Sequence, residues 1–257
     1  MSSILFEVKN SVGIITLNRP DKLNSFNREM ALLFQEKLEE CKSKKIRAVY
    51  IIGSGKAFSA GQDLAEVTDP NGPGMAKILA EHYNPIVTSI RRLEKPVVAA
   101  VNGVAAGAGC NIALCCDVVL ASASASFIQA FSKIGLIPDS GGTFMLPRLI
   151  GWQKASALML LGDKISSTDA EKMGMIYKIV PDETFYKDSF EIAERLANMP
   201  TKGLALTKQL LNMSSNNSFE EQLQDEDIYQ QKASNTKDFN EGVQAFLEKR
   251  KPNLIGE

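Results

Sequence analysis

The fold is decided by one stretch, Lys95-Pro96-Val97-Val98-Ala99-Ala100-Val101-Asn102-Gly103-Val104-Ala105-Ala106-Gly107-Ala108-Gly109-Cys110. Five consecutive apolar residues, 97–101, follow a proline and end at Asn-Gly, which is typical of a strand buried on both faces. A glycine-containing turn then leads into a helical-looking run. This order of strand, turn and helix is the unit of an α/β fold, so we expect buried parallel strands.

The flanking sequence repeats this alternation. Apolar patterning predicts strands and helices on both sides of the central stretch. The predicted strands are Ile4–Lys9, Val12–Leu17, Ala48–Ile52, Asp117–Ala121 and Ser126–Ile128. The predicted helices are about Asn27–Cys41 and about Ala76–Leu93, with a mobile polar loop over Val67–Gly74.

The pattern changes beyond Val180, where strand signals give way to helical ones. Three helices are expected, over Asp182–Met199, Thr201–Met213 and Phe219–Phe246. We therefore predict a core over residues 1–198 and a helical C-terminal segment over residues 199–257.

Bulk properties exclude several classes of protein. The chain has 257 residues, 44% of them hydrophobic and 23% charged, with a net charge of −1. No global basic field would therefore recruit nucleic acid or an anionic membrane. The N-terminus lacks the pattern of a signal peptide, and the four cysteines lack zinc or CxxC spacing. We expect a cytoplasmic protein with small buried thiols and no metal site.

Two glycine-containing turns are candidate anion sites: Ala57–Leu64 and Asn102–Cys110. Small residues at a helix start leave backbone N–H groups free and let a ligand approach closely. Tight packing of helix on strand explains either turn equally well, so both interpretations stay open.

A third stretch, Gly135-Leu136-Ile137-Pro138-Asp139-Ser140-Gly141-Gly142-Thr143, holds one acidic side chain in constrained backbone. Pro138 fixes its own φ and biases Ile137 toward extended geometry, and paired glycines follow. Asp139 is then either a helix cap or Asx-turn residue, or a positioned catalytic acid and base.

Together these segments resemble the crotonase (enoyl-CoA hydratase/isomerase) superfamily over essentially the whole chain. The matching motifs are Leu17-Asn18-Arg19-Pro20, Ala57–Leu64, Lys95–Gly103, Cys116-Asp117 and Gly135–Thr143. The resemblance implies a spiral of ββα units with a C-terminal helical trimerisation segment, and an acyl-coenzyme A thioester as substrate. It also implies an oxyanion hole formed by the backbone N–H groups of Gln62 and Ala108.

The family's hydratases use two glutamates, and the matching positions here are Asn111 and Phe131. The pattern with one Asp in Ile-Pro-Asp-x-Gly-Gly-Thr is most similar to the 1,2-epoxyphenylacetyl-CoA isomerase subfamily of bacterial phenylacetate degradation. The resemblance therefore implies that Asp139 is general base and then acid. One base that moves a proton between two carbons suffices for isomerisation.

The remaining site residues follow from the same resemblance or are candidates by position. Coenzyme A, which is part of the substrate and not a separate cofactor, would contact Lys22, Ala60, Asp63, Leu64, Phe246 and Lys249, the last two from the same or a neighbouring subunit. The acyl pocket would include Tyr83, Asn84, Asn111 and Phe131. An apolar surround from Phe127, Phe131, Ile137 and Phe144 would raise the pKa of Asp139. A homotrimer or dimer of trimers is expected.

Three alternatives stay open. The first is a hydratase-like enzyme of other acyl specificity. The second is the chemistry of dehalogenase relatives, in which an Asp attacks the substrate as a nucleophile, but the tryptophan and histidine that those relatives also use are missing at the matching positions. A third alternative, RNA binding, would use a loose basic cluster of Lys37, Lys42, Lys44, Lys45 and Arg47. Glu36, Glu39 and Glu40 interleave with that cluster, which also fits an ordinary charged helix face.

Overall fold

The computed structural model describes residues 2–257, and its larger sheet has the strand order β1-β2-β3-β5-β7-β10. The strands are β1 (Ile4–Lys9), β2 (Val12–Leu17), β3 (Ala48–Gly53), β5 (Val97–Val101), β7 (Val118–Ser122) and β10 (Lys178–Val180). β1 and β2 form an antiparallel hairpin, and the other neighbouring strands are parallel. The predicted α/β class with buried parallel strands is confirmed.

A second, smaller sheet has the order β4-β6-β8-β9. Its strands are β4 (Ala57–Ser59), β6 (Val104–Ala106), β8 (Ser126–Ile128) and β9 (Lys164–Ser166). Along the chain β3 is followed by β4, β5 is followed by β6, and β7 is followed by β8. In each pair the first strand belongs to the larger sheet and the second to the smaller sheet, and a helical segment follows the pair. This repetition is the spiral of ββα units that the resemblance implies.

The larger sheet is covered on both faces because successive side chains of a strand point in opposite directions. Val49 and Ile51 of β3 face the main core, together with side chains of α1 (Arg28–Glu40), α4 (Asn84–Arg92) and α5 (Ala108–Leu114). Tyr50 and Ile52 face the other side, where α9 (Phe185–Ala197) packs. The apolar run at residues 97–101 is divided between the two cores in the same way.

The other short helices lie in the connections between these elements: η1 (Pro20–Lys22), α2 (Leu64–Thr68), α3 (Gly74–Lys77), η2 (Ile78–Tyr83, a π-helical turn), η3 (Ala130–Ile134), α6 (Gly142–Ile150), α7 (Trp152–Leu161), α8 (Ser167–Lys172) and η4 (Asp182–Thr184). The loop expected over Val67–Gly74 is shorter than predicted, since α2 runs to Thr68 and α3 begins at Gly74. The four cysteines are free and buried, as expected.

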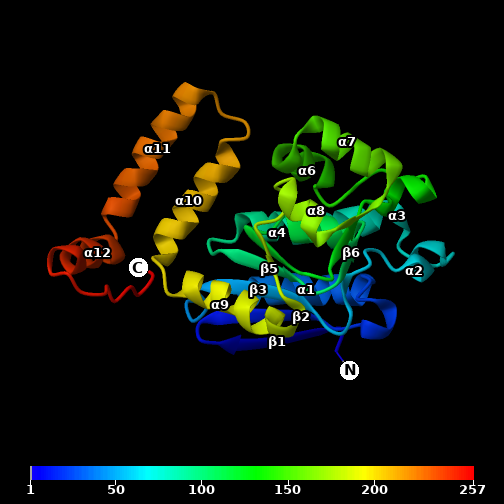
Figure 1. The fold of residues 1–257 in the computed structure, drawn as a ribbon, viewed down its shortest axis with the longest axis horizontal. Coiled ribbons are helices and arrows are strands. Elements are labelled where there is room, and N and C mark those ends of the chain that lie inside the picture. The colour runs from blue at the N-terminus through cyan, green and yellow to red at the C-terminus, as the bar shows by residue number, and fades with distance from the viewer. Residues whose placement is uncertain (1) are drawn as a thin grey trace.

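Three helices follow α9: α10 (Thr201–Met213), α11 (Phe219–Ser234) and α12 (Lys237–Leu247), which lie to one side of the sheets (Figure 1). The single helix predicted over Phe219–Phe246 is wrong. It is interrupted at Thr236, whose hydroxyl accepts a hydrogen bond from the Phe239 N–H and so starts a new helix. No helix within residues 2–257 combines the length and apolarity needed to cross a membrane.

Candidate active site

The two glycine turns lie against each other because β4 and β6 are parallel neighbours. Gly61 has a φ of +90°, and a Cβ there would lie 2.8 Å from the Ala106 carbonyl oxygen and 3.3 Å from the Ala108 nitrogen. Both the backbone conformation and the close approach require glycine. The fold therefore brings the Gln62 and Ala108 peptides to one place.

The N–H groups of Gln62 and Ala108 are available as donors. The Gly61 carbonyl accepts from the Phe26 N–H at 2.7 Å, and in a trans peptide the Gln62 N–H points the opposite way. Ala108 is the first residue of α5, where an N–H has no acceptor within the helix. Neither N–H donates to a protein acceptor within residues 2–257. Two unpaired donors side by side are what an oxyanion hole requires.

Asp139 lies in a turn that is attached to α5. Its carbonyl oxygen accepts from the Asn111 side-chain amide and from the Gly142 N–H, both at 2.8 Å. Asn111 is one helical turn after Ala108, so the Asp139 backbone is fixed relative to the start of α5. Gly141 is the N-cap residue of α6, which has no side-chain cap. Asp139 is therefore not the cap of that helix.

The Asp139 carboxyl is partly withdrawn from water. Burial raises its pKa above the ordinary value of 3.8, and donation from the Ser140 hydroxyl at 2.9 Å partly offsets this. The carboxyl lies in a cavity of about 280 Å³. The cavity is lined by Met75, Leu79, Asn84, Leu136, Ile137, Pro138, Asp139, Ser140, Gly141 and Thr143. Asp139 is the one carboxylate among these lining residues.

The apolar surround differs from the predicted one. Phe127 and Phe131 are buried, but the side chain of Ile137 is 81% exposed and that of Phe144 43% exposed. Phe144 instead lies 3.5 Å from the Arg148 guanidinium. The apolar wall opposite the turn comes from Met75 and Leu79, which lie in the segment before α4 and which sequence reasoning missed.

Of the four residues predicted for the acyl pocket, only Asn84 lines this cavity. Phe131 packs against the turn at Gly107, 3.7 Å from where a Cβ would stand. Asn111 lies beneath the Asp139 turn, because its amide donates to Asp139 and accepts from Gln129 at 2.7 Å. Tyr83 is fully buried and donates to the Gln62 side chain at 2.7 Å.

His82 is also fully buried, and burial lowers its pKa. Its Nε2 lies 3.2 Å from an Arg28 guanidinium nitrogen, and its Nδ1 has no partner within residues 2–257. His82 does not line the Asp139 cavity.

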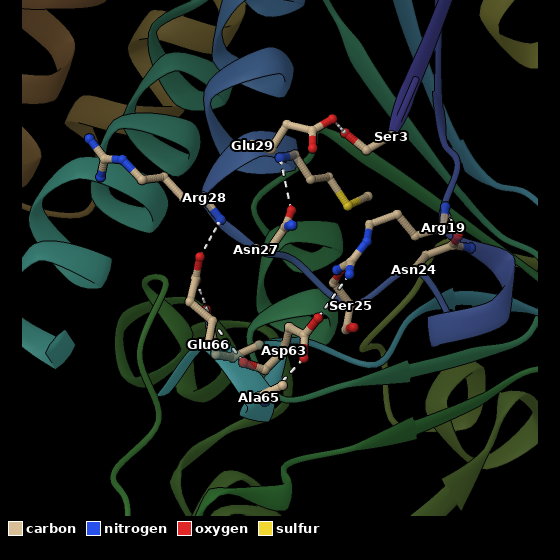
Figure 2. A network of polar contacts seen from close by, with 12 residues as sticks. Ser3, Arg19, Asn24, Ser25, Asn27, Arg28, Glu29, Asp63, Ala65 and Glu66 are labelled. Atoms are coloured by element: carbon tan, nitrogen blue, oxygen red, sulfur yellow. Dashed lines mark hydrogen bonds and ion pairs between the residues drawn. The ribbon is translucent and has the colours of Figure 1, made fainter. Parts of the chain in front are cut away.

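Four of the predicted coenzyme A contacts lie together beside Gln62. The Ala60 N–H donates to the carbonyl of Leu23, which follows the exposed Lys22. Asp63 forms an ion pair with Arg19 at 2.9 Å and caps α2, where Leu64 is exposed (Figure 2). The carboxylate of Asp63 is occupied by Arg19. Asp63 therefore contributes to the site by fixing the main chain next to Gln62.

Phe246 and Lys249 are not brought to this group within one chain. They lie on and just after α12, at the opposite side of the molecule from α2 (Figure 1). A contact between these residues and a substrate bound beside Gln62 requires a second subunit.

A larger cavity of about 490 Å³ lies elsewhere, between the ends of α1 and α4, the start of α10 and residues 255–257. Its walls include Lys42, Lys44 and Arg47 but none of the residues predicted for catalysis. The smaller cavity, with its single carboxylate, is the better candidate for an active site.

Residues 7–257 match the enoyl-CoA hydratase/isomerase family, and the chain belongs to this family of enzymes. It is 45% identical to the 1,2-epoxyphenylacetyl-CoA isomerase of Escherichia coli K12, over all of this chain and 99% of that one. It is 40% identical to a probable enoyl-CoA hydratase of Rhodobacter capsulatus, over 99% and 98% of the two chains. A solved structure from Mycobacterium abscessus, described as an enoyl-CoA hydratase/isomerase, superposes with a TM-score of 0.93 at 34% identity, covering 99% of this chain and all of that one.

Proposed function

We propose that the protein is an acyl-CoA isomerase in which Asp139 is the single general base and acid. The observation that carries this proposal is that the cavity has one carboxylate, Asp139, whose turn is bonded through Asn111 to the helix that begins at Ala108. The positions that match the hydratase glutamates hold Asn111 and Phe131. Asn111 is buried, donates to the Asp139 carbonyl and accepts from Gln129, and an amide cannot take a proton from water as a carboxylate does.

The proposed mechanism passes through a thioester enolate. Asp139 removes a proton from the carbon beside the thioester carbonyl, and the electron pair moves onto the carbonyl oxygen. The N–H groups of Gln62 and Ala108 stabilise that negative charge, each by about 3 kcal/mol. Asp139, now protonated, returns the proton to a carbon further along the acyl chain, which moves the double bond.

The substrates proposed are a ring epoxide, 1,2-epoxyphenylacetyl-CoA giving oxepin-CoA, and 3-enoyl-CoA giving 2-enoyl-CoA. The activity for which the Escherichia coli relative is named supports the first of these. Both reactions start from the same thioester carbonyl and need no second carboxylate.

For coenzyme A, we propose a path along Lys22, Ala60, Asp63 and Leu64, completed by Phe246 and Lys249 of a neighbouring subunit. The segment over residues 199–257 would then be the trimerisation segment, and residues 1–198 would hold the catalytic core. A homotrimer or a dimer of trimers is the proposed assembly.

The basic cluster gives little support to the RNA-binding alternative. Lys37 is paired with Glu36 and Glu40, and Lys42 with Glu39. Arg47 donates to backbone carbonyls and to Thr201. Three of the five cations are thus engaged within the protein, whereas a nucleic-acid surface needs free cations aligned with phosphates.

The direct test is the variant Asp139→Asn, assayed with the ring-epoxide thioester and with a 3-enoyl-CoA. We expect the variant to bind acyl-CoA like the parent while isomerisation falls by about 10²- to 10⁴-fold. Water addition to a 2-enoyl-CoA, measured in parallel, should be negligible in both proteins. Retained isomerisation in the variant, or a hydratase rate above the isomerase rate in the parent, would overturn the proposal.

A further inference from the structure

The side chain of Gln62 is held at both ends by hydrogen bonds. The Tyr83 hydroxyl donates to Gln62 Oε1 at 2.7 Å, and Gln62 Nε2 donates to a Glu66 carboxylate oxygen at 2.9 Å. These two partners come from η2 and α2, two separate elements that follow Gln62 in the chain. They also determine which way the amide faces, since an amide oxygen accepts and an amide nitrogen donates.

Glu66 is itself anchored. Its other carboxylate oxygen accepts from the Arg28 N–H at 2.7 Å, and Figure 2 shows the Glu66 side chain extending to that backbone nitrogen. Arg28 is the first residue of α1, where the free N–H groups and the helix dipole favour a negative charge. Gln62 is thereby tied, through one carboxylate, to the N-terminus of a helix of the core.

Tyr83 is a dependable donor. It is fully buried, and its ring lies 6.1 Å from that of Phe26 in an edge-on arrangement. Burial raises its pKa well above the ordinary value of 10, and the charges of Asp139, Glu66 and Asp63 add to this effect. The hydroxyl therefore keeps its proton throughout the working range of an enzyme.

The peptide that precedes Gln62 needs such restraint. Gly61 has a φ of +90° and, lacking a Cβ, can rotate more freely than other residues. Phe26 holds the main chain at the Gly61 carbonyl and at the Asp63 N–H, at 2.7 and 2.8 Å. The Gln62 N–H belongs to the same peptide plane as the Gly61 carbonyl, so one hydrogen bond directs both, and the two attachments of the Gln62 side chain further limit the tilt of that plane.

We propose that Tyr83 and Glu66 are positioning residues for the isomerisation: from two sides they fix the Gln62 side chain, and so the direction of the Gln62 N–H. This inference rests on the proposed function, since it gives that N–H the role of an oxyanion donor. Both side chains are hydrogen-bonded to Gln62, and the proposed role of each acts through that residue.

The test measures the thioester carbonyl of a bound, unreactive acyl-CoA by difference infrared spectroscopy. Phenylacetyl-CoA labelled with ¹³C at its carbonyl is the probe, because a hydrogen bond to the oxygen lowers the stretching frequency. The first variant, Tyr83→Phe, keeps the ring and removes the hydroxyl. The second, Glu66→Gln, replaces one of the two carboxylate oxygens with an NH₂ group, which cannot accept from the Arg28 N–H or the Gln62 amide. The control is Glu81→Gln, which removes another carboxylate that pairs with Arg28 but does not contact Gln62.

We expect the parent enzyme, Glu81→Gln and Asp139→Asn to show the full lowering of the carbonyl frequency. Tyr83→Phe and Glu66→Gln should lose part of it, and their kcat should fall about 3- to 10-fold at unchanged KM. Asp139→Asn distinguishes loss of the base from loss of the hydrogen bonds to the carbonyl oxygen, because this variant should lose turnover and keep the lowered carbonyl frequency.

A full shift with normal kcat in both Tyr83→Phe and Glu66→Gln would overturn the positioning role alone. An unshifted carbonyl in the parent enzyme, with the probe demonstrably bound, would overturn the proposed oxyanion hole and the positioning role together. Thermal unfolding checks that each variant is folded. Should Glu66→Gln be unfolded, Tyr83→Phe decides the question, because it removes a single hydroxyl.

Discussion

At the scale of single residues, Asp139 combines a fixed backbone with a carboxyl of altered acidity. Asn111 and Gly142 hold its carbonyl oxygen, while burial disfavours the charged form of its side chain. A carboxylate with a raised pKa is a stronger base than one in water, and its conjugate acid still gives the proton back readily. A raised pKa therefore favours both the removal of the proton and its return to the second carbon.

The pH profile of the isomerase should report this carboxyl. Because the ionised form is the base, kcat/KM should rise with pH through a midpoint above 3.8. The Ser140 hydroxyl donates to the carboxylate and lowers its pKa, so Ser140→Ala should move the midpoint upward. Initial rates across the acid range measure both midpoints. A midpoint that stays fixed or falls in Ser140→Ala would contradict the assignment of Asp139 as the titrating base.

The same carboxyl should cost stability. Its pKa is higher in the folded than in the unfolded protein, so the folded state binds more protons between the two values, and stability falls as pH rises through that window. Asp139→Asn removes the penalty. We expect the variant to unfold at higher urea than the parent at pH 7, with the difference narrowing as the pH approaches 3.8. Equal stability at pH 7 would show that burial does not disfavour this carboxylate.

At the scale of elements, prediction from sequence was best where a strand is long and apolar. The bounds of β1, β2 and β5 were predicted to the residue. In the second sheet only β8 is predicted from apolar patterning, also to the residue, whereas β4, β6 and β9 have three residues each, too few for a periodic signal. The break at Thr236 carries no glycine or proline and is fixed by a side-chain cap.

The candidate site shows the same limit. Asp139 and the glycine turns could be found from local residue types, because each constrains the backbone by itself. Met75, Leu79 and Glu66 could not, since their places depend on how α3, η2 and α2 fold against α1 and the Asp139 turn.

Packing of α5 on β4 gives a stability test at this scale. A Cβ on Gly109 would lie 2.6 Å from the carbonyl oxygen and side chain of Ser59, so Gly109→Ala should destabilise the fold by about 1–3 kcal/mol. A Cβ on Gly242 in α12 would have nothing within 4 Å, so Gly242→Ala should stabilise its helix by about 0.5–1 kcal/mol. Urea unfolding measures both changes. A harmless Gly109→Ala would mean that α5 can move away from β4.

At the scale of the whole molecule, the C-terminal helices leave large apolar side chains in water. Leu211 is 65% exposed, Phe219 72% and Phe246 83%, on α10, α11 and α12 respectively. These helices stand to one side of the sheets (Figure 1), so little of the same chain is available to cover them. Exposed apolar side chains are common on surfaces that associate, so these helices fit the proposed role of the segment in trimerisation.

The proposed assembly makes a prediction about the substrate site. Each subunit has a mass of 28.1 kDa, so light scattering should give three or six times that mass. Lys249→Gln should raise KM for the acyl-CoA substrate without changing the mass or kcat, because a cation for the phosphates is lost outside the catalytic centre.

Mixing subunits then tests whether Lys249 acts across the interface. A mixed trimer of Lys249→Gln and Asp139→Asn chains has sites in which an intact Asp139 meets an intact Lys249 from the neighbouring subunit. Those sites should combine the low KM that Lys249→Gln lacks with the turnover that Asp139→Asn lacks, after the two proteins are unfolded and refolded together. A monomeric mass, or a mixture whose KM stays that of Lys249→Gln, would show that the substrate is bound within one chain. Phe246 and Lys249 would then lie too far from Gln62 to contact it.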